Sequence, residues 1–510
     1  MASVRLRKAL GRLGRPGPRG VVVAISVLYV VLFSFLAIYK HEIYASSRFD
    51  LGNMDQAVWN SAHGRILEAT DEQGEITSRL KNHADFLLLA FVPLYWITPS
   101  PYWLLITQSA AVGLGAIPLY WLARRFLGRD WPAALIAVAY LLNYGLQSAN
   151  LFDFHAQMMA GTFLLFAFHY MLERRPFLFV LFAALASLTK EEVVLLVAMM
   201  GLYALFVEKR PRWGLPIFLA GTGYFLLIMQ VVIPAFNVGD TSQLVEGRYE
   251  AFGGSMGGVV RTAITDPIFT LSFLLSGDKP LYLASLLGMT GFLALFAPFV
   301  LAIPLPEIAI NLLSDRPQMA NIRYHYSAPI LPFVYVAAAA GIRNLLWLLR
   351  RAANLRRRPF AWLGRLAPGE TVREKLPLFL ALGMLLFGAQ TDYEAGPLPV
   401  FSAPDNTATV IHPSPEEHLD ALDEAVSLIP DGAKVSATNQ IGPHLAHRRY
   451  LYLFPTVQDA DYVVVDETTP AYDTYINPVL NLQTTAELRE SPGYRKLYER
   501  NGVVVFERRD

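Results

Sequence analysis

The chain has 510 residues, of which 54% are hydrophobic and only 17% are charged. Soluble domains carry about 25% charged residues, and disordered chains are polar and highly charged, so the composition excludes a disordered chain and disfavours a single soluble globule. The absence of cysteine excludes disulfides, thiolate metal sites and a cysteine nucleophile. The net charge of +1 gives no support for nucleic-acid binding, which needs a clustered basic face. These numbers predict a polytopic α-helical membrane protein.

Apolar runs of about the length that a membrane-spanning helix needs recur through residues 1–390. The first run, residues 21–39, contains no charge and is long for a signal peptide, so we expect an uncleaved helix. Further runs are expected at 103–123, 131–149, 156–172, 177–189, 193–207, 213–236, 281–301, 327–349 and 376–389. The short piece 303–313 contains Pro304, Pro306 and Glu307, which indicates a broken or re-entrant helix.

Basic residues of the short connections fall on one side of the alternating helices, which the positive-inside rule assigns to the cytoplasm. They are Arg5, Arg7, Lys8, Arg12, Arg15 and Arg19, then Arg124, Arg125 and Arg129, then Arg174 and Arg175, then Lys209, Arg210 and Arg212. The later basic loop 350–375 is either a topology determinant on anionic lipid or a binding site for a cytoplasmic partner. The alternation predicts about eleven passages, a cytoplasmic N-terminus and an extracytoplasmic segment 391–510.

Residues 391–510 are polar and read as a small extracytoplasmic α/β domain. Residues 415–429 have helical spacing, and residues 433–437 and 462–465 read as buried strands. Residues 494–507 predict two strands around the turn Asn501-Gly502. The segment contains no glycine-rich phosphate loop and no nucleophile–base pair, which favours structural support or substrate capture over catalysis.

The first outer loop, residues 40–102, contains two acidic residues shortly after the first helix, Asp50 and Asp55. The spacing of Leu51, Met54, Ala57 and Val58 predicts an amphipathic helix on the outer membrane face. Asp50 stands at the N-cap position of that helix, so it is either a cap or a functional acid. Asp55 projects from a different face. His83 and Asp85 follow in the same loop.

Three further outer loops carry polar side chains. Asp153 and His155 alternate in an extended loop and would fall on one side of it, either as a helix cap in a polar loop or as ligands of a divalent cation. Lys190, Glu191 and Glu192 form either a solvated turn or a functional cluster at membrane depth. The sequence Arg323-Tyr324-His325-Tyr326 suits either a phosphate or an interfacial belt. Together these loops predict an outer site that is acidic with one basic corner, for a substrate with a lipid tail and a polar head.

At these residues the sequence resembles the DUF2079 family of predicted membrane proteins, and that family is similar to the GT-C superfamily of polyprenyl-phosphate-dependent glycosyltransferases. The matching pieces are FDLGNMDQAVWNSAHG at 49–64, NHADFLLLAFVPLYWITP at 82–99, SLTKEEVVLL at 187–196, RYHYSAPILPF at 323–333 and IPDGAKVSATNQIGPHLAHRRYLYLFP at 429–455. The resemblance covers most of the chain.

The resemblance implies a GT-C-like helical fold and an inverting transfer of a sugar from a polyprenyl-phosphate donor at the cell membrane. It implies a catalytic acid just after the first helix, which Asp50 matches best and Asp55 second. In some members of the superfamily the corresponding outer loop carries metal ligands, and Asp153 and His155 match their position, for a divalent cation such as Mg or Mn. The resemblance also implies that Arg323 faces the donor phosphate. The remaining substrate-binding candidates are Tyr324, His325, Glu191, Glu192, His83 and Asp85. The chain has no Asp-x-Asp pair, so metal dependence stays open.

Two other functions compete with a transferase. A transporter or lipid flippase would use interrupted helices around a site at the membrane midplane, and the segment around Pro304 and Pro306 favours it. A non-enzymatic scaffold would use the C-terminal segment for interactions and would have no deep outer cavity.

Overall fold

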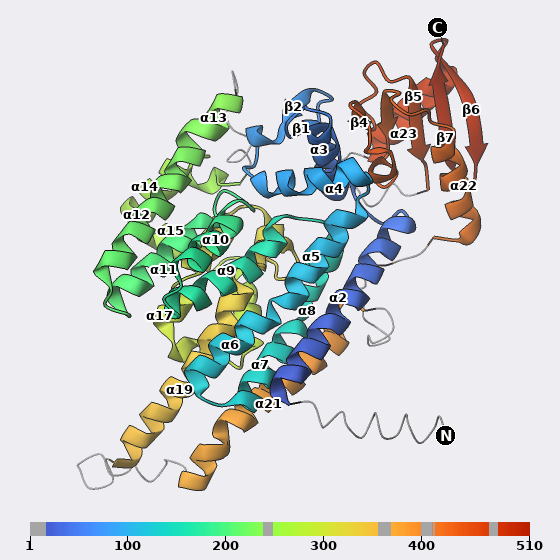
Figure 1. The fold of residues 1–510 in the computed structure, drawn as a ribbon. Coiled ribbons are helices and arrows are strands. Elements are labelled where there is room, and N and C mark those ends of the chain that lie inside the picture. The colour runs from blue at the N-terminus through green and yellow to red at the C-terminus, as the bar shows by residue number, and fades with distance from the viewer. Residues whose placement is uncertain are drawn as a thin grey trace, which may run out of the picture.

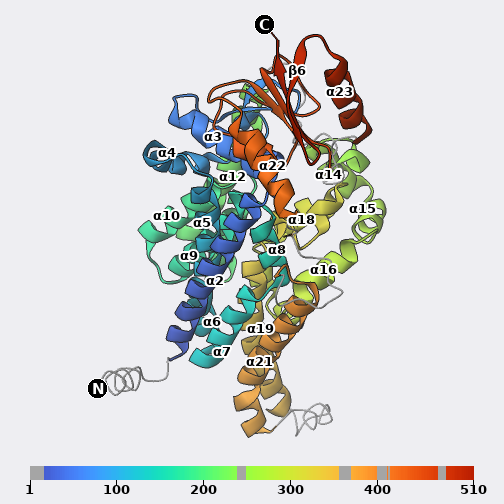
Figure 2. The same cartoon turned by 90° about the vertical axis from the view of Figure 1, so that its right-hand side faces the viewer.

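The computed structural model describes residues 17–237, 248–354, 369–398, 411, 414–468 and 478–509. Helices form an elongated bundle, and a β-sheet lies at one end of it, beside the elements of the first outer loop (Figure 1). The view turned by 90° places the sheet at the same end of the bundle (Figure 2). The basic residues Arg5, Arg7, Lys8, Arg12 and Arg15 and the loop segment 355–368 lie outside the described residues.

The apolar runs predicted between residues 21 and 236 are helical. The helices are α2 (Pro18–Glu42), α5 (Tyr102–Leu114), α6 (Ala116–Leu127), α7 (Asp130–Leu141), α8 (Tyr144–Phe152), α9 (Gln157–Leu172), α10 (Pro176–Ser187), α11 (Val194–Phe206), α12 (Pro211–Leu227) and α13 (Ile233–Phe236). A π-helical turn, η4 (Ile228–Val232), joins the last two. Helices α7 and α8 are bent by 42° at the break between them.

The second half of the bundle is more irregular. Its helices are α14 (Met256–Thr265), α15 (Pro267–Leu274), α16 (Lys279–Gly288), α17 (Pro298–Leu301), α18 (Leu305–Leu313), α19 (Leu331–Asn354) and α21 (Glu370–Ala395). The prediction of one span at 281–301 is wrong, because α16 ends at Gly288 and the short η6 (Leu293–Phe296) precedes α17. Gly291 and Phe292 have positive φ angles of 59° and 57°, which no helix accommodates.

Four helical segments in the described part of the chain are long and apolar enough to cross a membrane, or five if the bent pair α7–α8 counts as one. They are Pro18–Glu42, Tyr102–Leu127, Pro211–Phe236 and His325–Ala353. Helices α9, α10 and α11 are apolar but shorter than 18 residues. Eleven passages therefore require these shorter helices, and the count stays a prediction.

The sheet has the strand order β4-β3-β5-β7-β6. Its strands are β3 (Val435–Ala437), β4 (Leu451–Leu453), β5 (Tyr462–Asp466), β6 (Tyr494–Arg500) and β7 (Val503–Arg508). Helix α22 (Glu416–Ser427) packs on one face and α23 (Pro478–Glu490) on the other. The predicted hairpin is confirmed, with positive φ angles at Asn501 and Gly502. We call residues 414–509 the sheet domain; β4 and α23 were not predicted.

The first outer loop lies beside the sheet domain (Figure 1). Its elements are η1 (Arg48–Gly52), α3 (Asn53–Ala62), β1 (Glu68–Thr70), β2 (Ile76–Ser78), η2 (Arg79–Lys81), η3 (Phe86–Phe91) and α4 (Val92–Ile97). Helix α3 buries Met54, Ala57 and Val58 as expected. It also buries its polar face, because Gln56 donates to the carbonyl oxygens of Arg448 and Arg449 in the sheet domain, both at 3.1 Å. The expectation of a helix on the membrane surface is therefore wrong.

Cysteine labelling tests the orientation cleanly, because the chain contains no native cysteine. We expect Glu417→Cys, exposed in the sheet domain, to react with a membrane-impermeant maleimide on intact cells. Glu374→Cys, exposed near the start of α21, should react only after permeabilisation. The opposite pattern would invert the bundle and move every outer residue to the cytoplasm.

Candidate functional site

A cavity of about 1030 Å³ lies between the helical bundle, the first outer loop and the sheet domain. Ligand pockets commonly span about 300–1,000 Å³, so this cavity accommodates a large ligand. Of the candidate site residues that the sequence analysis named, nine line it: Asp50, His83, Asp85, Asp153, His155, Lys190, Tyr324, His325 and Tyr326. Residues 439 and 440 of the sheet domain line it as well.

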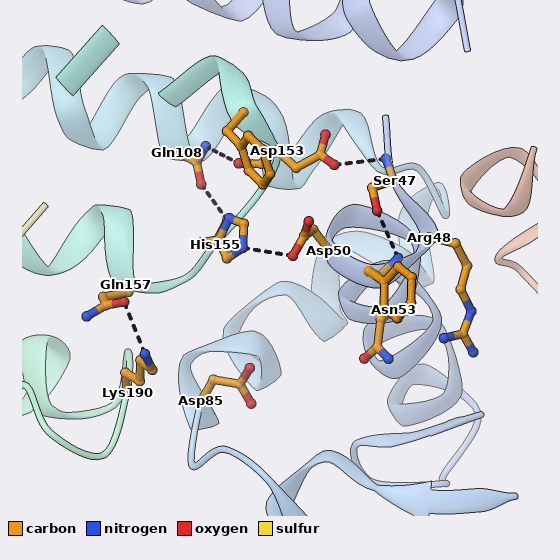
Figure 3. A network of polar contacts seen from close by, with 12 residues as sticks. Ser47, Arg48, Asp50, Asn53, Asp85, Gln108, Asp153, His155, Gln157 and Lys190 are labelled. Carbon is orange, nitrogen blue, oxygen red and sulfur yellow. Dashed lines mark hydrogen bonds and ion pairs between the residues drawn. The ribbon is translucent and has the colours of Figure 1, made fainter. Parts of the chain in front are cut away.

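Asp50 projects from the π-helical turn η1 into the cavity (Figure 3). It does not cap that turn, because the N-cap is Ser47, whose hydroxyl accepts from the backbone N–H of Phe49 at 3.1 Å. The carboxylate oxygen Oδ1 lies 3.0 Å from Nε2 of His155, and the side chain of Asp50 is 25% exposed. A carboxylate only accepts, so we assign the proton to Nε2 of His155. π-Helical turns are frequent at functional sites.

His155 is fixed from two other directions. Its backbone N–H donates to Oε1 of Gln108 at 2.7 Å, and its ring stacks on His325 with centroids 3.7 Å apart. These contacts leave the imidazole little freedom to turn. His155 therefore holds one oxygen of Asp50 in place and leaves the other oxygen for a ligand.

Asp153 points away from this pair. Its Oδ1 lies 2.9 Å from Nζ of Lys40 in the last turn of α2, and its Oδ2 accepts from the backbone N–H of Ser47 at 2.8 Å. Burial raises the pKa of Asp153 to about 6, although Lys40 lowers it in part.

The arrangement does not fit the predicted cation pair, since Asp153 and His155 bind different partners and Lys40 already supplies a positive charge. No group of three or more potential metal ligands occurs among residues 17–237, 248–354, 369–398 and the described part of the sheet domain.

The acidic residues after α10 lie beside the cavity instead of lining it. Glu191 accepts from the backbone N–H of Ala84 and lies 3.0 Å from Nδ1 of His83. Glu192 pairs with Lys190 at 2.6 Å. Lys190 itself reaches the cavity, 3.3 Å from Oε1 of Gln157, so this loop contributes a cation and not the expected acids.

Arg323 also lies outside the cavity lining. Its guanidinium sits 5.5 Å from the ring centroid of Tyr144, in a cation–π contact. The basic corner that the sequence assigned to Arg323 is supplied by other residues. The cationic residues that line the cavity are Lys40, Arg48, Arg79, Lys190, Arg248 and Arg316. Asp85 pairs with Arg79.

Asp55, the second candidate for the acid, is sealed from the cavity and 1% exposed. Its Oδ1 accepts from the hydroxyl of Tyr95 and lies 3.1 Å from Nε2 of His447 in the sheet domain. Burial alone would lower the pKa of His447, but the charge of Asp55 and the hydrogen bond between them raise it above its usual value. Asp55 therefore joins the first outer loop to the sheet domain and has no access to a substrate.

Several residues that line the cavity were not predicted, because their sequence context points only weakly to a site. Lys40 ends an apolar helix, where a lysine usually marks the membrane boundary. Asn439 and Gln440 lie two and three residues after the end of β3, and the carboxyl ends of parallel strands commonly carry ligand contacts. Arg248 and Arg316 stand in irregular connections without any motif.

The model of a family described as "Predicted membrane protein (DUF2079)" matches residues 40–505. The chain belongs to the DUF2079 family. No curated protein matches the sequence.

Among solved structures, ArnT from Cupriavidus metallidurans bound to undecaprenyl phosphate is similar, with a TM-score of 0.48 and 12% identity over 94% of this chain and 97% of that chain. The apo state of the same protein is similar with a TM-score of 0.47 and 13% identity, over 94% of this chain and 98% of that chain. The arabinofuranosyltransferase AftD from Mycobacteria is similar with a TM-score of 0.49 and 13% identity, over 94% of this chain and 39% of that chain. At these values the similarity assigns no activity to the family.

The Asp55–His447 pair predicts a pH-dependent stability. Because the pKa of His447 is raised in the folded state, the pair stabilises the fold fully below a pH of about 6.5 and loses this contribution as the pH rises through the raised pKa. The thermal midpoint in detergent should fall over this range in the native protein and fall less in His447→Gln. The exposed His63, replaced by Gln, is the control. Parallel pH profiles in the native protein and His447→Gln would contradict the role of this pair.

The Lys40–Asp153 pair predicts a large loss of stability when one partner is removed. Lys40→Met leaves a buried carboxylate without its cation, which commonly costs about 3–5 kcal/mol. The double variant Lys40→Met/Asp153→Asn should recover most of the loss, as measured by denaturant unfolding in detergent. Lys434→Met, which removes an exposed pair with Asp459, should change little. Equal losses in the single and double variants would contradict the pairing.

Proposed function

We propose that this protein is a membrane glycosyltransferase that moves a sugar from a polyprenyl-phosphate donor to an extracytoplasmic acceptor, with inversion at the anomeric carbon. The observation that carries the proposal is the carboxylate of Asp50, which faces a cavity of about 1030 Å³ while His155 holds one of its oxygens. The sequence resemblance to the GT-C superfamily, in the motif that contains Asp50, supports the donor class.

Asp50 acts in this proposal as the general base. The acceptor hydroxyl gives its proton to the free carboxylate oxygen, and its oxygen forms a bond to the anomeric carbon on the face opposite the phosphate. The bond between that carbon and the phosphate oxygen breaks, and the electron pair leaves with the polyprenyl phosphate. A positioned base of this kind contributes about 10²–10⁴-fold in rate.

The cationic side of the cavity suits the leaving phosphate. Lys190, Arg248 and Arg316 line it, and Nζ of Lys190 also lies 5.2 Å from the ring centroid of Tyr326. The Nε of Arg248 is buried and has no hydrogen-bond partner among the described residues. Fixed cations in a cavity of low dielectric constant stabilise negative charge that develops during the reaction. In this proposal these side chains take the place beside the donor phosphate that the sequence analysis assigned to Arg323.

The outer boundary of the bundle offers an apolar approach for the lipid chain. Helix α4 carries the exposed side chains of Trp96 and Ile97, 69% and 76% exposed, at the end of the apolar segment 86–97. Interfacial aromatic residues of this kind mark the membrane boundary. In this proposal the donor lies beside α4, the bundle makes about eleven passages, and the sheet domain is extracytoplasmic with the N-terminus in the cytoplasm.

A transporter is the second candidate, and one observation favours it. Glu307 in the short helix α18 is 0% exposed, and its Oε1 accepts from Nε2 of Gln157 at 2.7 Å. Ionisable groups within a membrane bundle are costly and mark pathways in transporters. Uptake of a lipid-linked sugar into vesicles without any transfer product would favour this candidate.

Replacement of Asp50 by Asn tests the transferase. Asparagine keeps the size of the side chain and an oxygen that accepts from His155, but it cannot take a proton. We expect a folded protein whose transfer rate from a polyprenyl-phosphate sugar falls about 10²–10⁴-fold, measured with purified protein in lipid nanodiscs.

Asp266→Asn is the matched control, because Asp266 accepts from the N–H of Phe269 as the cap of α15 and lies outside the cavity lining. Full activity of Asp50→Asn would exclude the base role. No turnover by the native protein with any such donor would exclude the transferase.

A further inference from the structure

The loop that follows β3 brings one side chain of the sheet domain onto the start of η1. The Oδ1 of Asn439 accepts from the hydroxyl of Ser47 at 3.1 Å and from the backbone N–H groups of Arg48 at 2.9 Å and Phe49 at 3.3 Å. Asn439 is 6% exposed. One amide oxygen thus receives three donors from a segment that is 390 to 392 residues away in the sequence.

These donors are the ones that a helical turn leaves without partners at its N-terminus. The hydroxyl of Ser47 accepts from the N–H of Phe49, and the N–H of Arg48 donates to the backbone carbonyl oxygen of Asn439 at 2.9 Å as well as to its side chain. A residue of another domain therefore completes the cap of η1. Asp50 stands one position after Phe49, within the same turn. A shift of this turn therefore moves the carboxylate of Asp50 relative to His155.

The backbones of the two segments also approach closely. A side chain at Gly442, in η10 (Gly442–Leu445), would meet Cβ and Cγ of Arg48 at 2.6 Å. A side chain at Gly52 would meet the backbone of Pro443 at 3.3 Å. These glycines allow Asn439 to reach η1 with a side chain as short as asparagine.

Other contacts hold the sheet domain without Asn439. The hydroxyl of Tyr44 donates to Asp423 at 2.8 Å, Arg48 donates to the carbonyl oxygen of Leu451 at 2.9 Å, and Gln56 reaches Arg448 and Arg449. Loss of the Asn439 contact alone should therefore leave the domain docked and the protein folded.

We propose that Asn439 is a positioning residue of the reaction, which sets the register of η1 and so directs Asp50 into the cavity; the proposal rests on the function proposed above. The sheet domain is thereby a part of the active site, and not only a support or a capture module. Gln440, the next residue, also lines the cavity, so the same loop forms part of the cavity wall.

Asn439→Leu tests the proposal, because leucine keeps the size and removes the side-chain acceptor oxygen, whereas the backbone carbonyl oxygen that accepts from Arg48 stays. We expect kcat to fall roughly 10²-fold, the effect of a displacement of about 1 Å at a catalytic group, with the KM for the donor unchanged. Asn439→Asp keeps the acceptor oxygen and should retain most of the rate. Gln458→Leu is the matched control, since Gln458 joins the same domain to the carbonyl oxygen of Gln73 in the outer loop at 3.0 Å.

A rate unchanged in Asn439→Leu, or an equal loss in Gln458→Leu, would overturn the proposal. A cryo-EM structure of Asn439→Leu decides it independently of turnover. We expect the 3.0 Å contact between Asp50 and His155 to be lost in that variant and kept in Gln458→Leu. Retention of the contact would overturn the positioning role, whereas inactivity of the native protein would overturn only the transferase.

Discussion

The geometry of the site depends on Ser47, which is held from two sides. Its backbone N–H donates to Asp153 of the bundle at 2.8 Å, and its hydroxyl donates to Asn439 of the sheet domain at 3.1 Å. Asp153 is in turn fixed by Lys40 at the end of the first helix. The turn that carries Asp50 therefore begins at a point where three parts of the molecule meet, and a displacement of any one of them reaches the carboxylate.

Charged side chains are dense around this point, and three oppositely charged pairs lie among them. Lys40 pairs with Asp153, Arg79 with Asp85, and Lys190 with Glu192. Pairing of this kind offsets the cost of removing charges from water, and the low dielectric constant of the interior strengthens the interactions that remain. This part of the cavity is preorganised, because the partners orient these paired charges before a ligand arrives.

Local patterns predicted much of the fold. The apolar run 21–39 became α2, the stripe of Leu419 and Leu422 became α22, and Asn501-Gly502 became a hairpin turn. The prediction of one continuous helix at 281–301 was wrong, because hydropathy contains no information about the backbone break at Gly291 and Phe292.

The site was predictable in part. The sequence analysis predicted that Asp50, Asp153 and His155 lie at the same end of the bundle, and all three line the cavity. It could not assign their partners, since Lys40 lies 113 residues from Asp153 and Asn439 lies 391 residues from Arg48. The sequence also did not predict that Arg323 lies over the ring of Tyr144 and outside the cavity lining. An arginine in a cation–π contact and an arginine in a phosphate site can have the same neighbours in the sequence. Long-range pairing is set by the tertiary fold, and periodicity carries no information about it.

The contacts between Gln56 and residues 448 and 449 have a consequence for biosynthesis. They join segments 392 and 393 residues apart, and a ribosome adds about 5–20 residues per second. The first outer loop is therefore made roughly 20–80 s before its partner exists, by the same rate. During that interval polar groups that are destined for burial face water or lipid, and the loop can reach its final structure only after residues 448 and 449 have been translated.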